Sequence, residues 1–162
     1  MILDKAYWNG RYSNNDTGWD LGAVSPPLKA YFDQLNDKNI KILIPGCGNS
    51  HEGEYLLAQG YTNVHLIDIS PEALNNIKRR VPAFPCENLH CENFFDHQEK
   101  YDLIFEQTFF CALDSKFRID YAKKMYDLLL EGGKLVGLLF GVQKNLDTPP
   151  FGDRKSTRLN SS

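Results

Sequence analysis

The stretch Ile44-Pro-Gly46-Cys-Gly48-Asn-Ser50 decides the predicted fold, because it joins a short buried strand to a helix through a glycine turn. Residues 41–44 are apolar after the lysine and predict the strand, which Pro45-Gly46 ends. Residues 51–59 predict the helix, with Gly60 as its stop. Glycines after a first strand let the backbone approach a ligand closely, although many such turns bind nothing.

The glycine turn is poorly suited to a pyrophosphate. A dinucleotide fingerprint needs a third glycine at its sixth position, and His51 stands there. The Gly-Lys-Ser/Thr sequence of a P-loop is also absent. The turn therefore favours a ligand other than a dinucleotide or a nucleoside triphosphate.

Asp68 follows the next predicted strand, residues 64–67, and lies 22 residues beyond Gly46. A carboxylate at this strand end accepts hydrogen bonds from the two vicinal hydroxyls of a ribose. The alternative is that Asp68 only caps the turn before Ser70-Pro71. The agreement of strand end, spacing and glycine turn favours the ribose interpretation.

Strands and helices alternate along the rest of the chain. The pattern predicts helices over 25–35, 51–59, 70–80 and 117–130, and strands over 41–44, 64–67, 87–90, 101–105 and 134–140. Short connections between alternating elements are typical of a doubly wound α/β domain with a mostly parallel sheet.

The bulk composition excludes several classes of protein. The 162 residues suffice for one domain, and a net charge of −3 predicts no nucleic-acid partner. The longest apolar run, residues 135–142, is too short to span a membrane, and no signal peptide begins the chain, so we expect a cytoplasmic protein. Cys86, His90 and Cys91 lack the paired spacing of a zinc site, so we expect no metal.

Longer motifs resemble a known family. They are Trp19-Asp-Leu-Gly22, Pro26-Pro27, the glycine turn, Leu66-Ile-Asp68-Ile-Ser70, residues 101–113 (YDLIFEQTFFCAL) and residues 149–152 (PPFG). In this order they resemble the thiopurine/thiol S-methyltransferase family, and residues 101–113 are most similar to its thiol and halide methyltransferase branch. The resemblance covers residues 5–152 and implies a Rossmann-like class I methyltransferase that uses S-adenosylmethionine.

The resemblance also implies a set of site residues. It places the cofactor against Trp8, Tyr12, Trp19, Gly46, Cys47, Gly48, Asp68, Ile69, Asn93, Phe94 and Glu106. It places the acceptor near Glu106, Gln107 and Phe110, with Phe109 as a further apolar neighbour, and it assigns no single catalytic residue. An aromatic face attracts a sulfonium cation, although packing alone also explains tryptophans and phenylalanines.

The implied reaction is direct in-line transfer of a methyl group to a small thiol, or to a halide or selenium acceptor. A thiol reacts as its thiolate, so alignment and exclusion of water matter more than a strong base. The alternatives are an oxygen or nitrogen acceptor, a domain that binds cofactor with little turnover, and, more remotely, an oxidoreductase. We expect a monomer whose partner is a small-molecule substrate.

The end of the sequence carries two further expectations. Residues 1–152 form the expected domain, whereas residues 153–162 are polar and without period, as in a tail foreign to the natural protein. Class I methyltransferases carry two more strands after the fifth, and we expect these to be missing. Residues 135–140 are then expected to form an exposed apolar edge.

Overall fold

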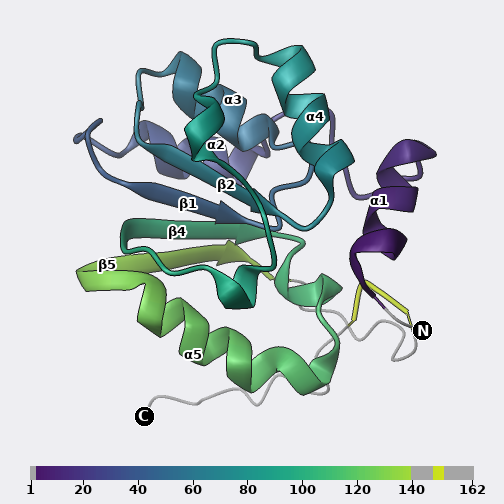
Figure 1. Ribbon diagram of the computed structural model, residues 1–162. Coiled ribbons are helices and arrows are strands. Elements are labelled where there is room, and N and C mark those ends of the chain that lie inside the picture. Colours follow the sequence, from purple (N-terminus) through teal and green to yellow (C-terminus); the bar gives the residue numbers. More distant parts are fainter. Residues whose placement is uncertain (1–2, 140–147, 152–162) are drawn as a thin grey trace.

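A computed structural model describes residues 3–139 and 148–151, and within them five strands form one parallel sheet. The strand order is β3-β2-β1-β4-β5 (Figure 1). The strands are β1 (Ile42–Pro45), β2 (Val64–Asp68), β3 (Leu89–Cys91), β4 (Tyr101–Gln107) and β5 (Leu129–Leu138). The predicted doubly wound, mostly parallel α/β fold is confirmed.

The two central strands are buried along their whole length. Every residue of β1 and β2 is buried, as is typical of parallel strands covered on both faces. Ile42 of β1 lies in register with Val64 of β2 on one side and with Leu103 of β4 on the other. The chain order reverses between β1 and β4, and ligands of such sheets bind at the carboxyl ends of the strands at this point.

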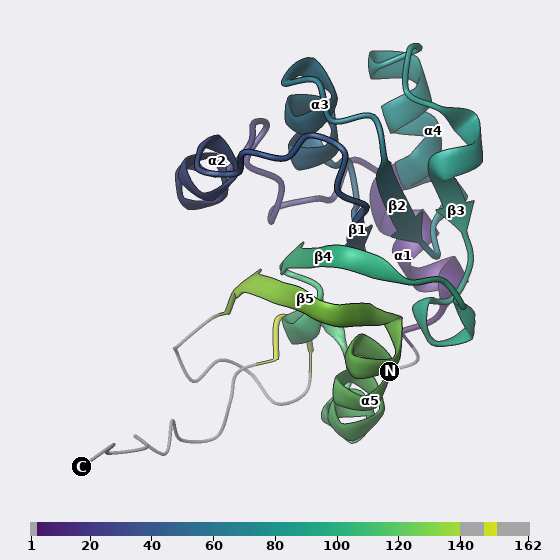
Figure 2. The ribbon, with the colours of Figure 1, turned by 90° about the vertical axis from the view of Figure 1, so that its left-hand side faces the viewer.

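Helices cover both faces of the sheet. Helices α2 (Pro26–Asp33), α3 (His51–Ala58) and α4 (Pro71–Arg80) pack on one face, whereas α5 (Arg118–Leu128) packs on the other (Figure 2). Four 3₁₀ turns complete the described secondary structure: η1 (Cys86–Asn88), η2 (Phe94–Asp96), η3 (Phe110–Ala112) and η4 (Ser115–Phe117).

Helix beginnings follow the sequence closely, with one exception. The Ser70 hydroxyl accepts the backbone N–H of Ala73 and so caps α4, as its place before a first-turn proline predicts. Ser25 occupies the same position before α2 but makes no capping hydrogen bond. Pro26 and Pro27 fill the first two positions of that helix, and proline has no N–H to donate.

Helix α1 (Lys5–Ser13) was not predicted. Asp4 begins it by accepting the backbone N–H of Tyr7. The helix lies beside the carboxyl ends of the strands and packs against α4 (Figure 1). Its apolar residues do not form a clear stripe, so periodicity did not reveal it.

The prediction around the last strand was partly wrong. The helix ends at Leu128 and the strand starts at Leu129, so Gly132 and Gly133 lie inside β5 and not before it. The pairing with β4 shifts in this region, and Gly132 has a φ of +77°, which accommodates the irregularity. Residue 140 of the predicted strand and the predicted tail 153–162 lie outside the described residues.

Strand β5 forms one edge of the described sheet and pairs with β4. Leu135 is 42% exposed and Leu139 is 66% exposed, which confirms the expected apolar edge over its described part. Among residues 3–139 and 148–151, each helix is too short or too polar to cross a lipid bilayer.

Candidate functional site

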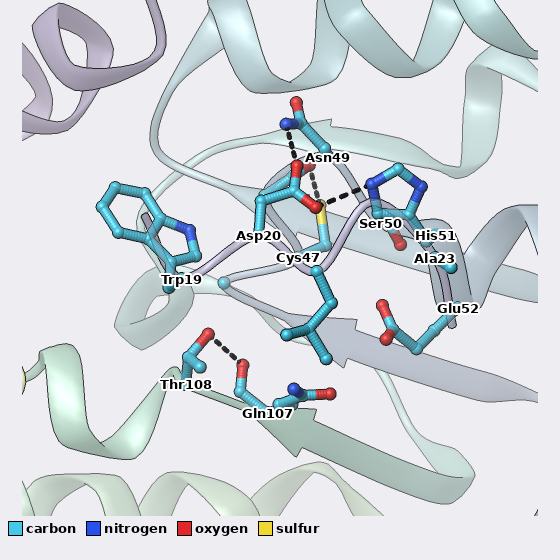
Figure 3. Close-up of a pocket in the computed structure, with 13 residues that line it drawn as sticks. Trp19, Asp20, Ala23, Cys47, Asn49, Ser50, His51, Glu52, Gln107 and Thr108 are labelled. Atoms are coloured by element: carbon cyan, nitrogen blue, oxygen red, sulfur yellow. Dashed lines mark hydrogen bonds and ion pairs between the residues drawn. The ribbon is translucent and has the colours of Figure 1, made fainter. Parts of the chain in front are cut away.

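A pocket lies at the carboxyl ends of β1 and β4, where the strand order reverses (Figure 3). Three segments line it: the segment after α1, the turn between β1 and α3, and the end of β4. These residues are Trp19, Asp20, Leu21, Ala23, Gly46, Cys47, Gly48, Asn49, Ser50, His51, Glu52, Gln107 and Thr108. The fold thus brings the predicted glycine turn together with Trp19 and Gln107.

Both glycines of the turn are required for conformation and for space. Gly46 has a φ of +56°, and a Cβ placed there would lie 2.2 Å from the ring of Phe109. Gly48 has a φ of +54°, and its Cβ would lie 2.5 Å from the Tyr12 hydroxyl. Side chains rarely adopt such φ values, and neither neighbour leaves room for a methyl group.

Asp68 joins the end of β2 to this turn. One carboxylate oxygen accepts the backbone N–H of Gly48 at 2.9 Å, and the other accepts that of Ser70 at 2.8 Å. Burial raises the pKa of Asp68 to about 6, because these hydrogen bonds only partly offset the loss of water. The turn-capping interpretation is therefore confirmed, and a ribose contact of Asp68 stays a prediction.

The predicted aromatic residues gather beside the turn. Trp19 makes edge-to-face contacts with Trp8 and Tyr12, each at 5.8 Å between ring centroids. Tyr12 is buried, and burial together with the Asp68 carboxylate raises the pKa of its phenol well above the ordinary value. Of the three rings, Trp19 lines the pocket.

Asn9 holds this aromatic group in place, and sequence reasoning did not single it out. Its side-chain oxygen accepts the Ser70 hydroxyl at 3.0 Å and the backbone N–H of Glu72 at 3.0 Å. These bonds fix α1 to the beginning of α4. Only the tertiary structure reveals the role, since an isolated asparagine within a polar helix carries no sequence signal.

Asp20 organises the other wall of the pocket and was also missed as a site residue. Its carboxylate accepts the Asn49 amide at 2.5 Å and contacts the His51 ring at 2.8 Å (Figure 3). Partial burial works against ionisation, but the hydrogen bonds from Asn49, Gly22 and His51 outweigh it and lower the pKa of Asp20. The available signal was the motif Trp19-Asp-Leu-Gly22, which contains this residue.

Of the other predicted cofactor residues, Cys47 lines the pocket. Ile69, Asn93 and Phe94 do not line it. Asn93 caps η2 by accepting the backbone N–H of Phe95 at 3.0 Å. Phe94 is buried against Phe109 with ring centroids 5.1 Å apart, and Ile69 is partly buried beside Asp68. Burial raises the pKa of the Cys47 thiol, which therefore stays protonated at neutral pH.

Glu106 is buried at 1% exposure on the α5 side of the pocket. One carboxylate oxygen accepts the backbone N–H groups of Phe109 and Phe110, and the other accepts the Tyr121 hydroxyl at 3.1 Å. Burial raises its pKa in spite of these bonds. The structure gives Glu106 a clear positioning role for the β4–η3 turn, and its contact with a cofactor stays a prediction.

Gln107 and Thr108 form the floor of the pocket at the end of β4. The side-chain oxygen of Gln107 is buried and accepts no hydrogen bond from the described residues. Thr108 has a φ of +65°, an unusual value for a β-branched residue, and its hydroxyl donates to the Gln107 carbonyl at 2.6 Å. Such strain clusters at ligand sites. Phe110, in contrast, packs against Tyr121 at 5.0 Å.

Comparison with known proteins agrees with this geometry. The sequence pattern of the thiopurine S-methyltransferase family matches residues 3–159. The chain belongs to this family. A probable thiol methyltransferase from Arabidopsis thaliana is 30% identical over 151 residues, which cover 89% of this chain and 66% of that protein. Thiopurine S-methyltransferase from Vibrio cholerae (strain M66-2) is 27% identical over 168 residues, covering 93% and 77%.

The thiopurine S-methyltransferase assignment is consistent with solved structures of the same fold. A complex of DhpI with SAM and HEP superposes with a TM-score of 0.65 at 14% identity and covers 85% of this chain and 65% of that one. Magnesium protoporphyrin IX methyltransferase from Synechocystis PCC 6803 gives 0.62 at 13% identity, covering 77% and 66%. The chain spans about two thirds of the length of its first curated relatives.

Proposed function

We propose that this chain binds S-adenosylmethionine and belongs to a methyltransferase that transfers a methyl group to a small thiol, or to a halide or selenium acceptor. The observation that carries the proposal is the pocket beside Asp68, with its two glycines and the Gln107 oxygen, which accepts no hydrogen bond from the described residues. Membership of a family with thiol and thiocyanate methyltransferases among its relatives favours a sulfur acceptor.

The residues of the pocket fit the proposed cofactor. The turn around Gly46 and Gly48 brings bare backbone to the pocket wall, where any side chain would collide with its neighbours. The buried Gln107 oxygen needs a donor, and the α-ammonium group of S-adenosylmethionine is one. Bound there, the cofactor would supply an electrophilic methyl group on a sulfonium.

Asp68 is proposed to hold the ribose. With a pKa of about 6 it is mostly ionised at pH 7, and an ionised carboxylate is a strong acceptor for a ribose hydroxyl. The bonds from Gly48 and Ser70 fix its orientation before a ligand arrives. Such preorganisation reduces the entropy lost on binding.

The acceptor side is proposed to work by alignment and by exclusion of water. Trp19 offers an aromatic face to a cation, and Phe109 covers Gly46 from the β4 side. A thiol with a pKa near 8.5 is a few per cent ionised at pH 7, so no buried base is needed. The raised pKa of Cys47 argues against its own use as a nucleophile.

Calorimetric titration of the chain with S-adenosylhomocysteine tests the cofactor site. We expect saturable binding that Asp68→Ala weakens at least tenfold, because the ribose loses its acceptor. Asp120→Ala, on the exposed side of α5, removes the same charge and is the matched control. No binding by the unaltered chain, or equal affinity in the Asp68 variant, contradicts the proposal.

The acceptor class needs a separate assay. With S-adenosylmethionine supplied, methylated products are measured for a panel of small thiols, iodide, phenols and amines. Turnover of thiols or iodide above phenols and amines supports the proposed chemistry. Preference for a phenol or an amine would move the assignment to an oxygen or nitrogen acceptor.

We also propose a cytoplasmic, monomeric enzyme. No disulfide joins the four cysteines, all of which lie within the described residues, and this suits a reducing compartment. The net charge of −3 gives no field that attracts nucleic acid or an acidic membrane. Sedimentation of the purified chain tests the oligomeric state.

A further inference from the structure

Three of the four histidines of the chain lie together, away from the pocket. His65 is on β2, His90 is on β3, and His97 follows η2. Ile67 pairs in register with His90, and His65 is two residues before Ile67, so both histidines point to the sheet face that α5 covers. Glu92, between β3 and η2, joins this group, which we call the histidine cluster.

The distances in the histidine cluster suit a single metal ion. Nδ1 of His97 lies 2.7 Å from Oε1 of Glu92, and Nδ1 of His90 lies 3.8 Å from the same oxygen. Ligand atoms of His90, Glu92 and His97 all lie within 4.8 Å of one another. An ion with bonds of about 2.0–2.2 Å requires its ligands to be roughly 3–4 Å apart, so small side-chain shifts suffice.

Hydrogen bonds around the histidine cluster favour one tautomer of neutral His90. The amide oxygen of Asn63 accepts from Nε2 of His65 at 2.9 Å, which leaves Nδ1 of His65 as an acceptor. Nε2 of His90 lies 3.0 Å from that nitrogen and must donate to it. In the neutral ring, Nδ1 of His90 then carries no proton and presents a lone pair toward the Glu92 carboxylate, 3.8 Å away. A lone pair facing an anion is satisfied by a cation between them.

His97 has the same kind of outer partner. Its Nε2 lies 2.7 Å from the hydroxyl of buried Tyr101, which would accept a hydrogen bond from Nε2–H when Nδ1 binds a metal. Histidine ligands in metal sites characteristically donate their other N–H in this way. Both histidines are thus supported by a buried hydrogen-bonding partner.

We propose that the histidine cluster binds a divalent zinc ion through Nδ1 of His90, the carboxylate of Glu92 and Nδ1 of His97. Two imidazoles and one carboxylate are ligands that zinc accepts, with water in the fourth position. Hard cations such as Mg²⁺ prefer oxygen ligands, so they fit this set less well. The cysteines Cys86 and Cys91, which drew attention in the sequence, are not among the ligands.

The electrostatic setting favours such an ion. Lys41 is paired with Glu99 at 2.5 Å, which offsets its positive charge. The Glu92 side chain is 38% exposed and leaves an entry path.

The proposed zinc site lies apart from the cofactor pocket but would affect a loop that is predicted to contact the cofactor. His65 and Asp68 are three residues apart on β2, about 10 Å along the strand, and point to opposite faces. Between Glu92 and His97 lie Asn93 and Phe94, which are predicted to contact the cofactor. Zinc would therefore brace the loop that carries these two residues.

Titration calorimetry of the metal-free chain with zinc chloride at pH 7 tests the proposal. We expect one ion per chain, with affinity reduced at least tenfold in Glu92→Gln, whose amide keeps the shape but loses the charge. Glu87→Gln, on the exposed turn η1, makes the same chemical change and should bind as tightly as the unaltered chain. Absence of binding, or equal binding by Glu92→Gln, overturns the proposal.

A second readout identifies the ligands directly. With only four histidines, the ring-proton NMR signals of His65, His90 and His97 should shift with zinc while those of His51 stay in place. A zinc ion held by Cys86 and Cys91 would survive Glu92→Gln and be lost in Cys86→Ser/Cys91→Ser, which also overturns the proposal. Neither experiment requires cofactor, so failure of the zinc proposal is distinguishable from failure of the proposed methyltransferase function.

Discussion

The carboxylate of Asp68 accepts the backbone N–H of Gly48 at 2.9 Å, although 20 residues separate them in the chain. This bond joins the carboxyl ends of β1 and β2 at the wall of the pocket. It explains why the glycine turn and the aspartate act as one unit. It also places a buried charge where its energetic effect is measurable.

Asp68→Asn should change how stability depends on pH. The folded pKa of about 6 lies above the ordinary value of 3.8, so the native state binds the proton more tightly. The contribution of Asp68 to stability is therefore largest below about pH 4 and declines as the pH rises to about 6. Relative to the unaltered chain, Asp68→Asn should gain at most about 3 kcal/mol between pH 4 and pH 7.

Urea unfolding of both proteins across this pH range measures the effect. Asp120→Asn, an exposed aspartate of α5, controls for the loss of one negative charge. A difference between Asp68→Asn and the unaltered chain that is constant with pH would show that burial of Asp68 has no energetic consequence.

Alanine at Gly46 or Gly48 should destabilise the fold by about 2–4 kcal/mol, because left-handed strain and steric overlap add. The added Cβ atoms would lie 2.2 Å from Phe109 and 2.5 Å from Tyr12, respectively. Gly60→Ala isolates the strain, since Gly60 has a φ of +90° with nothing within 4 Å, and should cost only about 1 kcal/mol. Chemical denaturation compares the three, and equal losses would refute the steric argument.

Tyr121→Phe should destabilise the protein by about 1–3 kcal/mol. The substitution removes the hydroxyl that donates to buried Glu106 at 3.1 Å and leaves the carboxylate with fewer partners. Tyr126→Phe deletes the same group from the same helix at a position that is 82% exposed, and should have little effect. Similar unfolding free energies for the two variants would contradict the assigned role of the Tyr121 hydroxyl.

Amide hydrogen exchange should distinguish the edge strand from the central one. β1 has a partner strand on each side, whereas β5 pairs with β4 at one edge of the described sheet. We expect some β5 amides to exchange at least tenfold faster than those of Ile42–Ile44, because they lack a partner strand. Uniform protection along β5 at low protein concentration would mean that another segment covers this edge.

Much of the fold was predictable because the signals are local. The buried strands at residues 41–44 and 64–67 are mainly apolar, and Ser70-Pro71 marks the start of a helix by local capping chemistry. The boundary between α5 and β5 was placed wrongly because two glycines indicate a turn, whereas the sheet absorbed them in an irregular strand. Pairing with a neighbouring strand outweighed local preference there.

The candidate site was predictable to the extent that motifs mark it. Gly46, Gly48 and Trp19, which the motifs single out, line one pocket. Asp20 was recognised as a pocket residue only from its contacts with Asn49 and His51. Asn49 and His51 lie 29 and 31 residues from Asp20 in the chain, so no short sequence motif predicts their contacts with it.

The sequence by itself determined the alternation of strands and helices, the glycine turn and the family, because each depends on residues close together in the chain. Only the tertiary structure decided which distant groups meet. It placed Glu106 under Tyr121 and gathered His65, His90 and His97 from separate elements. The physical reason is that sheet register and helix packing set these distances, and both are properties of the folded chain as a whole.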